Sequence, residues 1–191
     1  MVLKFGGTSV ADVPQIKKIA SKVIKEVNKD KKVIVVVSAM AGVTNNLINL
    51  VKSTSKSPLY SEYDVVLSSG EQVTSGLLAI ALHNLGINAR SWLGWQVPIL
   101  SDLSYGKALI EEIKTDQVFE FLNKNQVAII SGFQGVTKEN RITTLGRGGS
   151  DTSAVALAAA FSAERCDIYT DVDGVYTTDP RIVKSAKKLD K

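Results

Sequence analysis

The sequence reads Val33-Ile34-Val35-Val36-Val37 directly after the polar pair Lys31-Lys32. A continuous run of β-branched residues suits a strand of a parallel sheet, because both faces of such a strand are covered. A parallel sheet also needs crossover connections between its strands, and these are usually helices. The run therefore predicts that helices and further buried strands lie on either side of it in the sequence.

Short apolar runs and helical patterns alternate along the rest of the chain. Residues 2–5 are a short apolar run, and the apolar residues from Ile16 to Val27 recur at helical spacing behind a cap at Asp12 and a first-turn Pro14. This order predicts a three-layer α/β/α sandwich with a mostly parallel central sheet. We expect further helices over 46–51, 63–85, 115–122 and 151–161, with a break near Gly70 in the second and deep packing of the last. We expect further strands over 88–92, 127–131 and 167–170, and irregular chain from 93 to about 106.

The composition indicates an ordinary soluble protein that is large enough for one domain, with 191 residues, 45% of them apolar. The net charge of +4 is spread over scattered lysines, so we expect no nucleic-acid partner. The longest apolar run is too short to span a bilayer and the first residues are no secretory signal, so we expect a cytoplasmic protein without a membrane partner. The single Cys166 and single His83 exclude an internal disulfide and paired-histidine metal chemistry.

Ligands of parallel sheets bind in the loops that follow the strands. The first such loop is Lys4-Phe5-Gly6-Gly7-Thr8-Ser9. Two glycines let backbone amides approach an anion, and Lys4 and the N-terminus of the following helix add positive charge. The alternative is an ordinary strand-to-helix turn with a surface lysine. P-loop, protein-kinase and dinucleotide-binding motifs are absent from the sequence.

A second glycine-rich loop reads Thr143-Thr144-Leu145-Gly146-Arg147-Gly148-Gly149-Ser150-Asp151-Thr152. Arg147 offers a planar fork that suits a carboxylate or a phosphate. Ser150 and Asp151 are also good N-caps, which is their alternative role. Because capping alone does not require three glycines, we interpret this segment as a binding loop.

A third loop reads Tyr169-Thr170-Asp171-Val172-Asp173-Gly174-Val175-Tyr176-Thr177-Thr178-Asp179-Pro180-Arg181. Its Asp-Gly and Asp-Pro pairs are strong turn formers, which is the simpler interpretation. An EF-hand is not indicated, because the third oxygen ligand and the closing Glu are missing. The aromatic, hydroxyl and arginine side chains could together hold a nucleotide.

Two smaller candidates remain. The segment Ser38-Ala39-Met40-Ala41-Gly42-Val43-Thr44 follows the run at 33–37, and Glu71 lies in Ser69-Gly70-Glu71-Gln72. The first is either a ligand-contacting loop or a plain connection. Glu71, at the expected beginning of a helix, is either a ligand contact or a favourable charge at the helix dipole.

In combination, the motifs at 4–9, 146–152 and 169–176 resemble the signatures of aspartate kinases, which belong to the amino-acid kinase superfamily with its carbamate-kinase-like sandwich. The resemblance covers essentially the whole chain and includes residues 38–40, 70–72 and 132–136. Three long motifs in the same order are far more specific than any one of them.

The resemblance implies ATP-dependent phosphorylation of the side-chain carboxylate of L-aspartate to 4-phospho-L-aspartate, the first step of the aspartate-family amino-acid and diaminopimelate pathway. It places Arg147 on the α-carboxylate of aspartate and Glu71 near its ammonium group. It further implies catalytic roles for Lys4 and Asp151, ATP binding by Lys4, Phe5, Gly6, Gly7, Thr170, Asp171, Tyr176 and Arg181, and aspartate binding by Ser38, Thr44, Glu71, Arg147 and Ser150.

Such a reaction fits a chain with one histidine and one cysteine. A carboxylate nucleophile has a pKa of about 4 and needs no general base at neutral pH. Attack on the γ-phosphoryl group then depends on positioning and charge neutralisation. We expect Mg²⁺ as a cofactor, held by phosphate oxygens and water rather than by a protein metal site.

The resemblance departs at the end of the chain. Family members continue beyond the segment that resembles residues 181–191, with a further helix, a further strand, a second phosphate-facing lysine and regulatory ACT domains. We therefore expect residues 1–191 to be a catalytic domain that is incomplete at its C-terminus, without ACT domains and with exposed apolar surface that favours a homo-oligomer. The alternatives are an inactive ligand-binding remnant or a sister kinase for acetylglutamate, carbamate or a nucleoside monophosphate; Glu71 with Thr44 favours an amino acid that carries an ammonium group.

Overall fold

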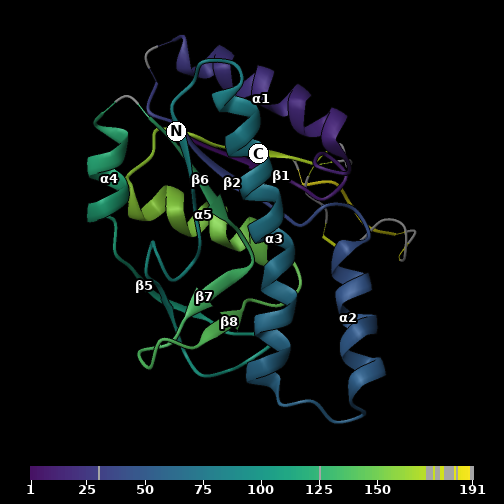
Figure 1. Cartoon of the computed structure of the whole chain (residues 1–191). Helices are drawn as coiled ribbons and strands as arrows, with labels where there is room; N and C mark the ends of the chain where they lie inside the picture. Colours follow the sequence, from purple (N-terminus) through teal and green to yellow (C-terminus); the bar gives the residue numbers. More distant parts are fainter. Residues whose placement is uncertain are drawn as a thin grey trace.

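Strand β2 (Ile34–Val37) is the middle strand of a five-stranded sheet in which every pair is parallel (Figure 1). The computed structural model describes residues 1–29, 31–124, 126–170, 174, 177–178, 183 and 185–189. The strand order is β3-β6-β2-β1-β9, with β1 at Val2–Phe5, β3 at Ala89–Trp92, β6 at Val127–Ser131 and β9 at Cys166–Tyr169. All four residues of β2 are buried, so the parallel strand predicted from the β-branched run is confirmed.

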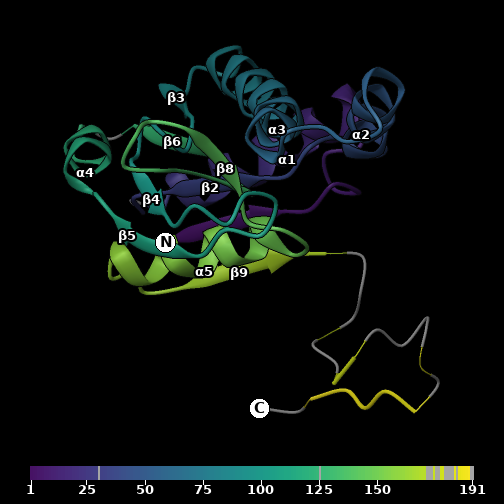
Figure 2. The same ribbon diagram turned by 90° about the horizontal axis from the view of Figure 1, so that it is seen from below.

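Helices cover both faces of this sheet (Figure 2). On one face α1 (Val13–Val27) and α3 (Tyr60–His83) pack against side chains such as that of Val35. On the other face α4 (Asp116–Leu122) and α5 (Gly149–Ala160) pack against the alternate side chains of the same strands. The predicted three-layer α/β/α sandwich with a mostly parallel sheet is confirmed.

The first helix begins where the sequence predicts. The carboxylate of Asp12 accepts a hydrogen bond of 2.8 Å from the backbone N–H of Gln15, and Pro14 lies in the first turn, where a missing N–H costs nothing. The helix then directs Ile16, Ile19, Ala20 and Val23 into the core.

A second sheet lies beside the sandwich and was not predicted. It contains four short strands in the order β5-β4-β7-β8, with β4 at Ile99–Ser101, β5 at Ile110–Ile113, β7 at Gln134–Val136 and β8 at Ile142–Thr144. The expectation of irregular chain from 93 to 106 is therefore wrong at β4, and Thr143 and Thr144 belong to a strand rather than to a loop. Three of these strands have only three residues and β5 reads Ile-Glu-Glu-Ile, so no continuous apolar run marks them in the sequence.

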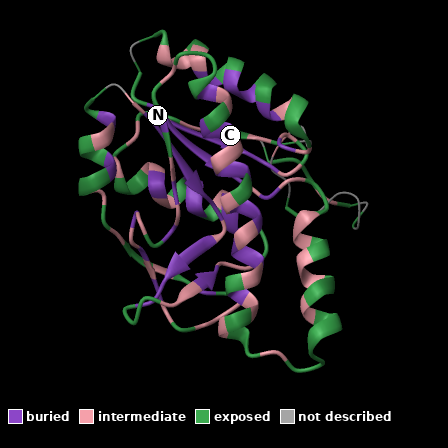
Figure 3. Ribbon diagram, viewed as in Figure 1, coloured by how far each residue is buried: buried purple, intermediate pink, exposed green. Residues whose placement is uncertain are grey.

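The predicted break in the helix at Gly70 is wrong, because α3 is continuous from Tyr60 to His83. A Cβ atom at Gly70 would lie 2.8 Å from the Cβ of Ala39, closer than carbon atoms approach in proteins. Gly70 is thus a site of close approach between the helix and the loop after β2, not a helix end. The neighbouring α2 (Val43–Thr54) is longer than the predicted 46–51 and has no buried residue (Figure 3).

The expectation that the helix at 151–161 is deeply packed is only half right. Gly149, Ser150, Ser153, Ala154 and Leu157 of α5 are buried, whereas Val155 is 56% exposed. The reason is that the exposed side of α5 consists largely of alanine, which is apolar but small enough to be tolerated at a surface.

Helix α3 is long and apolar enough to cross a membrane when length and composition alone are considered. Half of its apolar window is buried within the fold, and two carboxylates of the helix, Asp64 and Glu71, are buried there as well. These are the properties of the core helix of a soluble protein.

The two glycines inside α3 provide a matched test of this packing. We expect Gly70→Ala to lower the free energy of unfolding by about 1–3 kcal/mol, because the new methyl group collides with Ala39. Gly76→Ala, whose methyl group would meet nothing within 4 Å, should instead raise it by roughly 0.5–1 kcal/mol through helix propensity. Urea unfolding of both variants measures this, and a change of the same sign in both would contradict the packing argument.

Candidate active site

The carboxyl ends of four adjacent strands lie in register at one edge of the central sheet. Phe5 at the end of β1 pairs with Val37 of β2 and with Tyr169 of β9, and Val37 pairs with Ser131 of β6. The loops that follow these strands therefore leave the sheet side by side. This is the position at which parallel sheets bind ligands.

A cleft of about 910 Å³ opens at this edge. Lys4 and Arg147, which are 143 positions apart in the sequence, both line it. The cleft also brings together the rest of the predicted site that the structure describes, apart from Phe5: Gly6, Gly7, Ser38, Thr44, Glu71, Ser150, Asp151 and Thr170.

One side of the cleft presents positive charge and unpartnered backbone amides. The Lys4 side chain, 8% exposed, places its Nζ 2.5 Å from Oδ1 of Asp151. Within the described part of the chain, the N–H groups of Gly7 and Thr8 donate to no protein acceptor. A Cβ atom at Gly7 would lie only 3.2 Å from the carbonyl oxygen of Ala39, so a glycine keeps this turn tight. Free amides beside a lysine suit an anion such as a phosphate.

The beginning of α5 forms a second set of donors. Its N-cap is Gly148, in the left-handed region at φ 72°, and no side chain caps the helix. Ser150 and Asp151 lie in the first turn instead, so their alternative role as N-caps is wrong. In the described residues the amides of Gly148 and Ser150 also have no acceptor, and the helix dipole adds positive potential there.

Glu71 is a buried carboxylate that is only half satisfied. Its Oε1 accepts a hydrogen bond of 3.0 Å from the N–H of Ala39, whereas its buried Oε2 has no partner among the described residues. Burial raises the pKa of Glu71 to about 7, and the hydrogen bond from Ala39 opposes this shift. A carboxylate oxygen that lines a cleft and lacks a partner is suited to a cationic ligand group.

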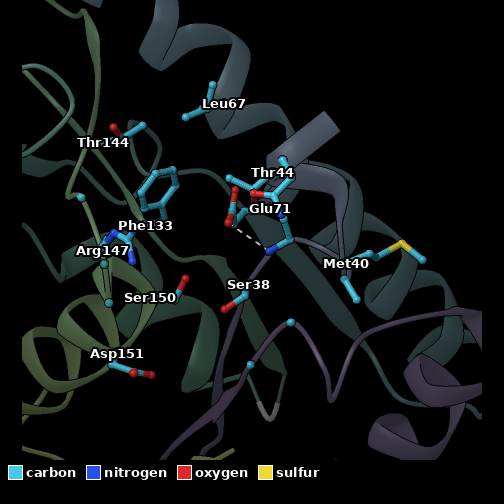
Figure 4. A pocket seen from close by; sticks show the side chains of 18 of the residues that line it. Ser38, Met40, Thr44, Leu67, Glu71, Phe133, Thr144, Arg147, Ser150 and Asp151 are labelled. Atoms are coloured by element: carbon cyan, nitrogen blue, oxygen red, sulfur yellow. Dashed lines mark hydrogen bonds between the residues drawn. The ribbon is translucent and has the colours of Figure 1, made fainter. Parts of the chain in front are cut away.

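Arg147 and Glu71 approach the cavity from different elements (Figure 4). The Arg147 guanidinium comes from the segment between β8 and α5, and the Glu71 carboxylate comes from α3. Thr44 lies beside Glu71, and Ser150 and Ser38 lie nearer to Asp151 in this view. The cleft thus has a cationic and an anionic group at separate places on its wall.

Some predicted site residues lie elsewhere. Phe5 does not line the cleft: its ring is buried and stacks on Tyr169 with centroids 4.6 Å apart. Asp171, Tyr176 and Arg181 lie outside the described residues.

Sequence reasoning missed several residues of the wall. Tyr63 and Leu67 come from α3, Gly106 comes from the connection between β4 and β5, and Phe133 comes from the loop after β6. The clearest signal for Phe133 is conformational rather than sequential: it has a φ of 68°, which a bulky residue adopts only where its surroundings impose it. The wall from the second sheet was missed because its strands were not predicted.

The fold is a three-layer α/β sandwich, and its cleft brings Lys4 and Arg147 together with the buried carboxylate of Glu71. The family model described as "Amino acid kinase family" matches residues 1–191. The chain belongs to this family, which confirms the resemblance inferred from its motifs.

Characterised relatives give the same result. The chain is 57% identical over 192 residues to an aspartokinase of Rickettsia felis and 53% identical over 189 residues to an aspartokinase of Geobacillus stearothermophilus. Each comparison covers 99% of this chain, but only 48% and 46% of the respective relative. The chain thus spans about half the length of these proteins.

Solved structures are similar as well. Aspartokinase III of E. coli, in complex with aspartate and ADP, superimposes with a TM-score of 0.83 at 30% identity, over 99% of this chain and 53% of that one. Aspartate kinase from Synechocystis gives a TM-score of 0.78 at 44% identity, over 97% of this chain and 31% of that one. An isopentenyl phosphate kinase, at 20% identity and a TM-score of 0.63, shares the fold.

The unusual environment of Glu71 can be measured directly. We expect its side-chain carboxyl carbon to titrate with a midpoint near pH 7 in ¹³C NMR spectra, because burial disfavours the charged form. Glu26 is the internal control, since its hydrogen bond from Lys29 lowers its pKa below the usual range. A midpoint for Glu71 that coincides with that of exposed glutamates would contradict the structure of this wall.

Proposed function

We propose that this chain is the catalytic part of an aspartate kinase, which transfers the γ-phosphoryl group of ATP to the side-chain carboxylate of L-aspartate. The observation that supports this most directly is that Lys4, Arg147 and Glu71 line one cleft, and that Oε2 of Glu71 has no partner among the described residues. A nucleotide phosphate, a carboxylate and an ammonium group each have a matching partner there. The aspartokinase relatives, one of them described with aspartate and ADP, support the same assignment.

The glycine side of the cleft would bind the phosphates of ATP. The amides of Gly7 and Thr8 and the charge of Lys4 offer donors for phosphate oxygens, and no side chain of Gly6 or Gly7 obstructs their approach. Asp151 keeps the Lys4 ammonium oriented through their ion pair. Among the residues proposed for the nucleotide, Thr170 lines the cleft, whereas Phe5 ends β1 directly before the glycine turn and stacks on Tyr169.

The opposite side would bind the amino acid. Arg147 can hold the α-carboxylate with two parallel hydrogen bonds, and Glu71 can accept hydrogen bonds from the ammonium group. Thr44, Ser38 and Ser150 provide hydroxyl groups between these two charges and the phosphate side. An amino acid held at both of its charges presents its side chain in one fixed direction.

The proposed reaction requires little acid–base catalysis by the protein. An oxygen of the aspartate side chain attacks the γ-phosphorus, a P–O bond forms, the bond to the β-phosphate oxygen breaks, and ADP leaves. The nucleophile is already ionised at neutral pH, so no proton needs to be removed. The chain contributes alignment and the positive charges of Lys4 and the α5 N-terminus, where negative charge must be stabilised.

Mg²⁺ would accompany the nucleotide and neutralise part of the phosphate charge. The donor set fits a nucleotide-borne ion better than a resident one: in the described residues no group of three or more His, Cys, Asp and Glu side chains could hold a metal. We infer that the ion would be bound through phosphate oxygens and water.

Residues 1–191 would form the catalytic domain of a cytoplasmic enzyme in the synthesis of aspartate-derived amino acids. The relatives are about twice as long, so the activity of this chain on its own is part of the proposal. Assembly into a homo-oligomer stays a prediction.

Acyl-phosphate formation tests the proposal. We expect the chain, given Mg-ATP, L-aspartate and hydroxylamine as a trap, to produce the hydroxamate of aspartate together with ADP. Lys4→Ala should reduce the rate on the order of 10²-fold, because it removes a cation from the phosphate side. Lys18→Ala, at an exposed position of α1 outside the cleft, is the matched control and should keep the wild-type rate.

The same assay separates the competing functions. Turnover with N-acetylglutamate but not with aspartate would assign a sister kinase, since the acetyl group removes the ammonium that Glu71 is proposed to bind. Binding of ADP in a calorimeter without any turnover would assign an inactive ligand-binding remnant. Equal rates for Lys4→Ala and the wild type would refute the proposed phosphate side.

Aspartate binding should also release protons. At about pH 6.5 the free protein carries Glu71 largely protonated, because its pKa is raised to about 7, and an ammonium ligand requires the ionised form. Binding should therefore release roughly three quarters of a proton, and the amount should fall toward zero above about pH 8. Calorimetry in buffers of different ionisation enthalpy measures this, with Glu71→Gln as the variant in which the release disappears.

A further inference from the structure

Asp64 is the other buried carboxylate of α3, and it has no part in the proposed binding of ATP and aspartate. It lies seven residues before Glu71, two turns along the same helix, and is completely buried. Unlike Glu71, it does not line the cleft. Burial raises the pKa of Asp64, and its hydrogen bonds oppose this shift.

Both oxygens of Asp64 are satisfied by residues that do line the cleft. Oδ2 accepts hydrogen bonds from the backbone N–H groups of Gly106, at 2.9 Å, and Thr144, at 2.8 Å. Oδ1 accepts a hydrogen bond of 2.8 Å from the hydroxyl of Thr144. One side chain thus ties α3 to two separate segments of the second sheet, each of which contributes to the cleft wall.

These two segments support Arg147. Thr144 ends β8, three residues before Arg147, and Gly106 lies against Gly146, where a Cβ atom would be 3.3 Å from the Gly106 carbonyl oxygen. The segment around Gly106 is closed by Asp102, which accepts hydrogen bonds from Ser104 and from the N–H of Leu109. The chain before Arg147 therefore packs against the segment around Gly106, and Asp64 is hydrogen-bonded to both.

We propose that Asp64 is a positioning residue for the amino-acid substrate: it fixes the Arg147 segment relative to α3, and thereby the separation between Arg147 and Glu71. This inference rests on the proposed function, in which these two groups bind the carboxylate and the ammonium of one amino acid. Glu71 and Asp64 both belong to α3. The positions of the two groups that would bind the ends of the substrate, Arg147 and Glu71, are therefore both set relative to this helix. The phosphate side, built on β1 and the turn after it, has no bond to Asp64.

The test uses the whole chain and two variants of Asp64. Asp64→Ala removes the acceptor of the Gly106 and Thr144 amides, of which that of Thr144 is buried. Asp64→Asn can keep all three hydrogen bonds, because its carbonyl accepts from the two backbone N–H groups and its amide group donates to the Thr144 hydroxyl, which can rotate. Thr74→Ala is the matched control: Thr74 is equally buried in α3, but its hydroxyl donates to the Gly70 carbonyl of its own helix.

Two measurements are made on each protein: hydrogen exchange of the Gly106 and Thr144 amides by NMR, and calorimetric titration with L-aspartate and, separately, with ADP. We expect Asp64→Ala to speed both exchange rates and to weaken aspartate binding by tenfold or more, with ADP affinity changed less than about threefold. Asp64→Asn should remain within about threefold of the wild type throughout. Thr74→Ala should move neither amide nor either affinity beyond that margin.

Equal losses of aspartate and ADP affinity in Asp64→Ala, or unchanged exchange and aspartate binding, would overturn the positioning role. If Asp64→Ala does not fold, Thr144→Val replaces it; loss of the hydroxyl donor should speed Gly106 exchange, and an unchanged rate would overturn the proposal. A wild-type chain that binds no aspartate refutes the proposed function. In that case faster exchange in Asp64→Ala alone would mark Asp64 as a structural tie, and the positioning proposal would fail with the function.

Discussion

The parallel register of the central sheet is the constraint on which the rest of the structure depends. Because Phe5, Val37, Ser131 and Tyr169 are aligned across adjacent strands, the chain must leave the sheet four times at the same edge. Any ligand group recruited by one of these loops is then a neighbour of the others, however distant it is in the sequence. The loop after β6 also lies against the beginning of α5, because a Cβ atom at Gly132 would lie 2.9 Å from the Cβ of Ser150, and there Asp151 meets Lys4 across 147 positions.

The sheet alone would bind only an anion, and α3 adds the opposite charge. Its core position is set by apolar residues such as Leu78 and Leu82, which are fully buried against the sheet. Two carboxylates share that burial, which raises the pKa of both; the carboxylate of Asp64 accepts three hydrogen bonds, whereas that of Glu71 accepts one, from Ala39. A protein gains no stability from leaving a buried oxygen unpaired, so the half-satisfied group is the one to associate with a ligand.

Long and strongly patterned features were predictable from the sequence. Local patterns mark the run at 33–37, the capped helix after Asp12 and the glycine-rich turns at Gly6 and Gly148. Together these patterns predicted the sandwich and most of the residues that line its cleft. The second sheet was not predictable in this way, because strands as short as Ile99–Ser101 and Gln134–Val136 take their stability from partners that local patterns do not reveal. Gly70 was misread for a related reason: a glycine required by a tertiary contact with Ala39 looks the same in sequence as one that ends a helix.

The second sheet also explains how one cleft can separate two kinds of recognition. In the proposed function, the phosphates would bind to backbone amides beside the charge of Lys4. The amino acid would bind to side chains from α3 and from the segment after β8, two elements with no strand pairing between them. Their relative position must therefore be fixed by side chains, and in the described part of the chain the bonds from Asp64 to Gly106 and Thr144 join them. The phosphate side could have been built on any parallel sheet, whereas the choice of acceptor depends on a polar contact between two sub-structures.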